Sequence, residues 1–180
     1  MRTLKVNLPT ALTLSRIVLI PVFVLAVYNH PVIGAIVFSI ASITDFLDGY
    51  LARKSGQITK FGIIMDPLAD KFLVISALIV LVDMERLSAL IAIVLIVREF
   101  LVTALRVVAL SRDIVIPAET GGKLKTGAQI TSILCLILVG SVFDNFPFDL
   151  YDAGMVFIWI ALILAVVSGV QYTVSFWKKV

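Results

Sequence analysis

Four aspartates lie close together in one stretch of the sequence that also carries glycines and basic residues. Asp45 and Asp48 are three residues apart, and Asp66 and Asp70 are four residues apart. On a helix, either spacing places both side chains on the same face. Two neighbouring helices that each carry one such pair could therefore bring four carboxylates to a shared site.

A cluster of carboxylates suits one or two hard divalent cations, because such ions prefer oxygen ligands. The chain has one His and one Cys, so zinc is not expected, and Mg²⁺ or Mn²⁺ is the predicted ion. Mg²⁺ commonly binds a few carboxylates together with substrate phosphates, which suggests a phosphorylated or pyrophosphate substrate. The alternative is that the carboxylates only form ion pairs with nearby basic residues, which are Arg53, Lys54, Lys60 and Lys71.

The rest of the chain is strongly apolar, which indicates an integral membrane protein. Of the 180 residues, 61% are hydrophobic and 15% are charged, a composition unlike that of ordinary soluble domains. Apolar stretches long enough to cross about 30 Å of hydrocarbon alternate with short polar breaks. The sequence predicts an all-α fold in one domain, residues 1–180, with six transmembrane helices at about 12–28, 32–53, 60–82, 87–110, 126–143 and 153–177.

The distribution of charge predicts how these helices are oriented. Lys and Arg gather at both ends of the chain and in the breaks at 54–60 and 111–125, whereas the other breaks hold only Arg86 among several acidic residues. By the positive-inside rule, both ends of the chain and these two breaks are cytoplasmic. Pro9 and Thr10 are suited to begin a short N-terminal interfacial helix, and a frayed tail is the alternative. No cleavable signal peptide is expected, because the first apolar segment lacks a small-residue cleavage site.

A second group of basic residues falls near the cytoplasmic level of the carboxylates. Its members are Arg106, Arg112, Lys123 and Lys125. Such a group could bind a phosphate on a second substrate. The alternative is that they are ordinary charges of a cytoplasmic loop, although Arg106 lies within an apolar stretch. Arg98 and Glu99 lie deeper in the same stretch, and we expect them to have a structural role, with contact to the substrate as the alternative.

The stretch with the four aspartates resembles the signature of the CDP-alcohol phosphatidyltransferase family, D-x2-D-G-x2-A-R-x8-G-x3-D-x3-D. Eight residues match it without a gap: Asp45, Asp48, Gly49, Ala52, Arg53, Gly62, Asp66 and Asp70. In this family, six transmembrane helices surround a cytoplasmic-side site with two divalent cations, where the phosphatidyl group of a CDP-linked lipid passes to an alcohol and CMP is released. The resemblance implies that the aspartates bind the metal ions and that Asp70 is also the general base. The other four residues would shape the cytidine and pyrophosphate pocket.

Three further segments resemble one group within this family, the bacterial phosphatidylglycerophosphate synthases: NLPTALTLSR, VREFLVTALR and GGKLKT. The resemblance implies CDP-diacylglycerol as donor and sn-glycerol 3-phosphate as acceptor. It also implies a homodimer in the lipid of the bacterial plasma membrane, with the active site facing the cytoplasm and no nucleic-acid partner. The same chemistry with inositol phosphate, serine or phosphatidylglycerol as acceptor is the nearest alternative. A membrane prenyltransferase and a divalent-cation carrier are more remote ones.

Overall fold

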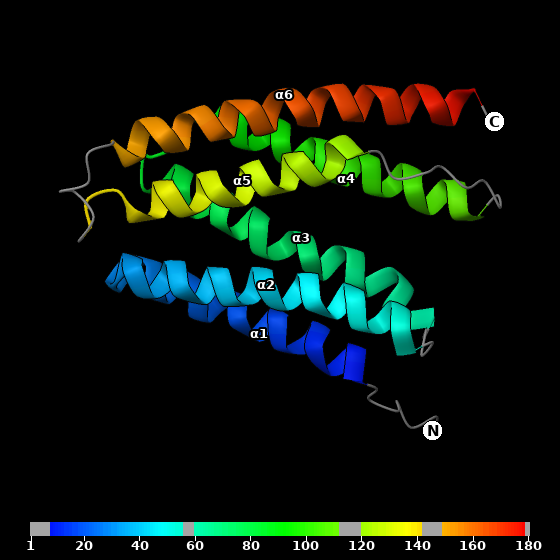
Figure 1. Ribbon diagram of the computed structural model, residues 1–180, viewed down its shortest axis with the longest axis horizontal. Coiled ribbons are helices and arrows are strands. Elements are labelled where there is room, and N and C mark those ends of the chain that lie inside the picture. Colours follow the sequence, from blue (N-terminus) through cyan, green and yellow to red (C-terminus); the bar gives the residue numbers. More distant parts are fainter. Residues whose placement is uncertain (1–7, 56–59, 112–119, 142–148, 179–180) are drawn as a thin grey trace. The chain divides into compact units, whose positions relative to one another are not determined.

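The computed structural model describes residues 8–55, 60–111, 120–141 and 149–178, and over these residues it is all-helical (Figure 1). Side chains are described over 18–44, 71–109, 124–141 and 149–178. The helices of the described part are α1 Leu8–Asn29, α2 Pro31–Ser55, α3 Lys60–Asp83, α4 Ala89–Ser111, α5 Thr120–Leu138 and α6 Leu150–Trp177. The prediction of six helices is confirmed, and α5, which begins and ends earlier than predicted, deviates most.

The predicted interfacial helix at the N-terminus is not a separate element in the described residues. α1 begins at Leu8 and continues without a break to Asn29, so Pro9 and Thr10 lie in the first turn of the same helix that continues through the first apolar stretch. Proline is well accepted in a first turn, because the N–H groups there have no partner within the helix. The rest of the predicted element, residues 1–7, lies outside the described residues.

One helix in the described part, α6, is both long and apolar enough to cross a membrane, with 28 residues and a mean hydropathy of 2.5 over an 18-residue stretch. Shorter apolar stretches lie at Val18–Asn29, Pro31–Thr44 and Leu124–Leu138, within α1, α2 and α5. The helical secondary structure of the six predicted spans is thus confirmed. That all six cross a membrane stays a prediction.

The chain divides into two compact units, Met1–Ala77 and Leu78–Val180. In the first unit α1 packs against α2, and the rings of Phe23 and Phe38 lie 5.5 Å apart between their centroids. A Cβ atom added to Gly34 would lie 2.3 Å from Cγ2 of Val27, and it would also meet the Val27 backbone. Gly34 therefore permits the close approach of the two helices.

In the second unit, α6 packs against α4 and α5 through buried apolar side chains. Gly154 of α6 lies against α5, where an added Cβ would be 2.7 Å from Cγ of Leu136 and 3.3 Å from Cβ of Cys135. The Ser132 hydroxyl donates to the Gly154 carbonyl oxygen at 2.7 Å, which fixes the register of these helices. Cys135 is a packing residue in this contact, as its apolar sequence neighbours predict.

The turn between α3 and α4 carries Arg86, whose side chain binds α5. Glu85 adopts a left-handed backbone with φ 58°, and the N–H groups of Glu85 and Arg86 donate to carbonyls in the last turn of α3. This is the arrangement of a Schellman C-terminal motif. The Arg86 guanidinium extends to α5, where Nη1 donates to the carbonyl oxygens of Leu136 at 2.9 Å and Ile137 at 2.8 Å.

Candidate functional site

The four aspartates lie on two consecutive helices, with Asp45 and Asp48 on α2 and Asp66 and Asp70 on α3. With a rise of 1.5 Å per residue, Asp45 is about 15 Å from the end of α2, and Asp70 is about 15 Å from the start of α3. By the same measure, Asp48 and Asp66 are each about 10 Å from those ends. The two pairs therefore occupy matching distances from the connection between the helices.

The connection between α2 and α3 consists of residues 56–59, so the joined helix ends lie within about 18 Å of each other. α2 ends and α3 begins at the same end of the first unit, and both helices extend from this connection toward the same side, so the chain runs antiparallel through them (Figure 1). Equal distances along the two helices therefore correspond to equal levels. This backbone arrangement supports a four-carboxylate site.

The side chains of the eight signature residues lie outside the described side chains. Their metal, catalytic and nucleotide roles accordingly stay predictions. Among the side chains that the structure does describe, no group of three or more His, Cys, Asp or Glu residues is placed to hold a metal ion. The fit to Mg²⁺ or Mn²⁺ therefore rests on the donor set, four carboxylates at two matching levels.

The basic residues predicted to bind an acceptor phosphate occupy different surroundings. Arg106 is exposed on α4, whereas Lys125 on α5 is buried, with 4% of its surface exposed. Lys123 belongs to α5, but its side chain is outside the described part, and Arg112 lies in the segment 112–119, which the structure does not describe. A shared pocket formed by these four residues thus remains a prediction.

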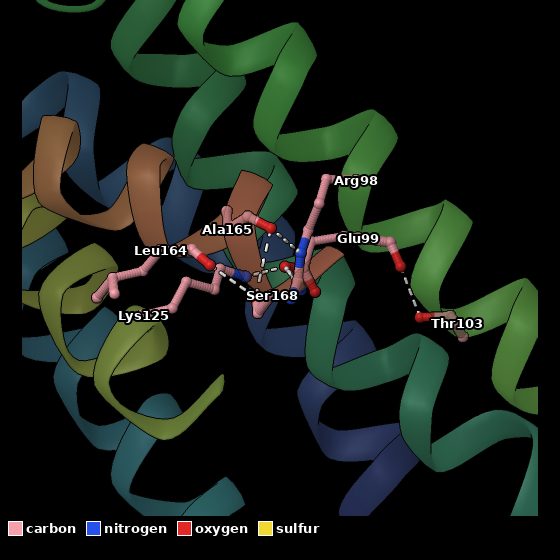
Figure 2. A network of polar contacts seen from close by, with 7 residues as sticks. All are labelled: Arg98, Glu99, Thr103, Lys125, Leu164, Ala165 and Ser168. Atoms are coloured by element: carbon pink, nitrogen blue, oxygen red, sulfur yellow. Dashed lines mark hydrogen bonds and ion pairs between the residues drawn. The ribbon is translucent and has the colours of Figure 1, made fainter. Parts of the chain in front are cut away.

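Lys125 belongs to a network of polar contacts that joins three helices of the second unit (Figure 2). Its ammonium contacts Oε1 of Glu99 on α4, and Nη1 of Arg98 donates to the same oxygen at 3.0 Å. The side chains of Arg98 and Glu99 are only 15% and 13% exposed. In such surroundings an unpaired charge is costly, so removing one partner of this group is expected to be unfavourable.

Arg98 continues the network to α6. Its Nε donates to the carbonyl oxygen of Ala165 at 2.9 Å, and its Nη2 donates to the hydroxyl of Ser168 at 2.6 Å. A Cβ on Gly169 would lie 3.3 Å from Cγ of Arg98, so the glycine leaves room for the arginine stem. The predicted structural role of Arg98 and Glu99 is confirmed, because both link α4 to neighbouring helices.

A buried polar stripe on α5 was not predicted from the sequence. Lys125, Gln129 and Ser132 are spaced at four and three residues, a pattern that places them on one helix face. All three are buried, and Gln129 is 2% exposed with no hydrogen-bond partner for Nε2. The signal was present in the sequence as polar residues at helical spacing within an otherwise apolar stretch.

Comparison with known proteins identifies relatives over nearly the whole length. The family model for CDP-alcohol phosphatidyltransferase matches residues 6–167. A CDP-diacylglycerol–glycerol-3-phosphate 3-phosphatidyltransferase of Bacillus subtilis (strain 168) is 42% identical, over 96% of this chain and 96% of that protein. A protein of the same name from Rickettsia bellii is 40% identical, over 92% of this chain and 93% of that protein. A probable phosphatidylglycerophosphate synthase of Mycobacterium tuberculosis is 40% identical, over 92% of this chain and 79% of that protein. The chain belongs to the CDP-alcohol phosphatidyltransferase family.

Proposed function

We propose that this protein transfers the phosphatidyl group of CDP-diacylglycerol to sn-glycerol 3-phosphate, giving phosphatidylglycerol phosphate and CMP. The observation that carries the proposal is the near full-length similarity to enzymes named for this reaction in Bacillus subtilis and Rickettsia bellii. In this reaction, the acceptor hydroxyl oxygen forms a bond to the phosphorus of the phosphatidyl group. The bond from that phosphorus to the oxygen of the CMP phosphate breaks, and CMP leaves.

The four aspartates would hold two divalent cations, Mg²⁺ or Mn²⁺. Their placement on consecutive helices at matching levels supports this assignment, as does the preference of these ions for carboxylate oxygens. When bound, the ions would supply charge stabilisation to the pyrophosphate.

The remaining signature residues complete the donor side of the site. Asp70 would take the proton of the acceptor hydroxyl, a role that a carboxylate can fill when it lies within hydrogen-bond reach of that proton. The cytidine and pyrophosphate pocket would be shaped by Gly49, Ala52, Arg53 and Gly62. The two glycines would allow a ligand to approach the helix backbone closely.

The acceptor phosphate would be bound by basic residues that follow the signature, which are Arg106, Arg112, Lys123 and Lys125. Arg106 supports this assignment because an exposed guanidinium can bind a phosphate through two parallel hydrogen bonds. Lys125 would contribute a point charge held in place by its neighbours.

The protein would be a homodimer in the bacterial plasma membrane, with six spans and the site on the cytoplasmic side. Exposed apolar side chains on several helices support contact with lipid, and among them are Val18, Ile40, Leu90 and Ile163. Single cysteines introduced into the predicted cytoplasmic and external breaks, in a Cys135→Ser background, would test the topology. Labelling with an impermeant thiol reagent from the outside should modify only the external set.

The function is tested by measuring CMP release from CDP-diacylglycerol by the purified protein in detergent with Mg²⁺. We expect release that depends on glycerol 3-phosphate, that stops on chelation with EDTA and that returns on addition of Mg²⁺ or Mn²⁺. Release with a different alcohol would contradict the acceptor assignment while leaving the donor assignment intact. No release with glycerol 3-phosphate, inositol phosphate, serine or phosphatidylglycerol would refute the proposed function.

The site assignment is tested in the same assay with Asp70→Asn, which we expect to abolish turnover. Asp152→Asn is the matched control, because Asp152 is exposed in the first turn of α6 and belongs to neither predicted pocket. Wild-type activity of Asp70→Asn, or equal losses in both variants, would contradict the assignment of the aspartates.

A further inference from the structure

We propose that Glu99 is a positioning residue for Lys125, holding its ammonium where the phosphate of the acceptor binds. Arg98 in turn holds the Glu99 carboxylate (Figure 2). The inference rests on the proposed function, and within it on Lys125 as a ligand of the acceptor phosphate. It adds two residues that lie outside the family signature and outside the predicted pockets.

The side chain of Lys125 is held in place before the acceptor binds. A lysine side chain has four rotatable bonds, and fixing it costs about 1.5–2 kcal/mol of conformational entropy. Lys125 is buried, and its ammonium contacts Oε1 of Glu99. Its side-chain entropy is therefore lost when the protein folds, and not when the acceptor binds. An ammonium has three N–H donors, and it can therefore bind a carboxylate and a phosphate at the same time.

The Glu99 carboxylate is itself held in place by Arg98. Oε1 of Glu99 also accepts a hydrogen bond from Nη1 of Arg98 at 3.0 Å. The other nitrogens of this guanidinium are fixed on α6, where Nε donates to the Ala165 carbonyl at 2.9 Å and Nη2 donates to the Ser168 hydroxyl at 2.6 Å. Ser168 also donates to the Leu164 carbonyl at 2.6 Å. Groups on α4 and α6 therefore set the place of the Lys125 ammonium.

The competing interpretation is that Glu99 and Lys125 form an ion pair that only joins α4 to α5. The two interpretations differ in what happens when the carboxylate is kept but moved, as in Glu99→Asp. A purely structural pair predicts that this variant has a lower unfolding midpoint and an unchanged KM for glycerol 3-phosphate. A positioning role predicts a raised KM for glycerol 3-phosphate, because the Lys125 ammonium moves with the carboxylate that it contacts.

The experiment compares, in detergent with Mg²⁺, the wild type, Lys125→Met, Glu99→Gln, Glu99→Asp and the double variant that combines Glu99→Gln with Lys125→Met. The readouts are kcat, the KM for glycerol 3-phosphate, the KM for CDP-diacylglycerol and the midpoint of thermal unfolding. We expect Lys125→Met to raise the KM for glycerol 3-phosphate about 10- to 100-fold, because the variant loses one charge-assisted hydrogen bond to the acceptor phosphate. The KM for CDP-diacylglycerol should stay within about twofold.

The double variant should have the same raised acceptor KM as Lys125→Met, because Glu99 acts through Lys125 and has no further effect once the ammonium is gone. Glu99→Asp keeps the charge but shortens the side chain, so we expect a smaller increase in the acceptor KM with little change in unfolding temperature. Glu85→Gln is the matched control, because Glu85 is an exposed glutamate outside the network.

Glu99→Gln alone leaves Arg98 and Lys125 without the carboxylate that they share, so it is the variant most at risk of misfolding. The decisive comparison is therefore between Glu99→Asp and Lys125→Met. A wild-type acceptor KM in Glu99→Asp, while Lys125→Met raises it, would overturn the inference. An unchanged acceptor KM in Lys125→Met would also overturn it, while the proposed function would stand if CMP release still required glycerol 3-phosphate.

Discussion

Arg86 offers a stringent test of the fold, because one side chain from the turn before α4 holds the end of α5. Its Nη1 donates to the carbonyl oxygens of Leu136 and Ile137, in the last turn of a helix that ends at Leu138. Carbonyls in a last turn have no partner within the helix. We predict that Arg86→Met destabilises the protein while leaving the kinetic constants of the folded enzyme unchanged.

The expected magnitude follows from these contacts. A hydrogen bond to a charged group contributes about 1.5–3 kcal/mol, and a cation at a helix C-terminus adds about 0.3–1 kcal/mol. Because one nitrogen serves both carbonyls, we expect a total loss of about 2–4 kcal/mol rather than the full sum. For a chain of this size, that loss lowers the midpoint of thermal unfolding by roughly 5–15 °C.

The assay is thermal unfolding in detergent followed by circular dichroism, together with CMP release at a temperature where all variants are folded. Arg86→Lys keeps the charge but loses the planar donor group, so its loss should be intermediate. Two results would refute the reasoning. The first is a midpoint for Arg86→Met within about 2 °C of the wild type, and the second is equal destabilisation by Lys and Met, which would show that the hydrogen-bond geometry is irrelevant.

Three further predictions concern stability and use the same unfolding assay. Gly34→Ala should destabilise the protein by about 1–3 kcal/mol, because its new Cβ would lie 2.3 Å from Cγ2 of Val27. Gly127→Ala is the control and should be neutral or stabilising, because a Cβ there would meet nothing within 4 Å. Equal effects of the two substitutions would contradict the close packing of α1 and α2. Glu85→Gly should stabilise by about 1 kcal/mol, because glycine adopts φ 58° without strain; a loss of stability would contradict this. Gln129→Met should raise the unfolding midpoint, because it removes a buried donor that has no partner; a drop of several degrees would show that the amide is satisfied in the folded protein.

The six helices were predictable because long apolar stretches and short polar breaks determine them locally. The ends of α5 were harder to predict, since the helix ends at Leu138, before Gly140 with its left-handed φ of 71°. Its last carbonyls are bound by Arg86, which is 50 residues away from Leu136 in sequence. An end that depends on so distant a residue cannot be read from the local pattern of apolar residues.

In the polar network, the sequence likewise did not predict which residue pairs with Glu99. An acid such as Glu99 deep in an apolar stretch is expected to find a cationic partner, so the existence of an ion pair was predictable. The sequence offers several candidate cations, and it does not say which of them reaches the carboxylate. The choice of Lys125 depends on how α4 and α5 each pack against α6, and the contact between Lys125 and Glu99 is visible only in the folded unit (Figure 2).

The proposed donor and acceptor sides of the reaction therefore depend on the sequence in different ways. The four aspartates occupy a single stretch, Asp45 to Asp70, on two helices joined by residues 56–59, so local spacing specifies which two helices carry them and that each pair shares a helix face. The proposed acceptor contacts instead depend on long-range packing, since Arg98 of α4 is held by α6 and Lys125 of α5 is held by α4. Substitutions in the packing of α4, α5 and α6 should accordingly alter the choice of acceptor while leaving the donor chemistry of the signature intact. A local motif such as that of the four aspartates identifies the family from sequence, whereas long-range contacts such as those of Arg98 and Lys125 are found only in the structure.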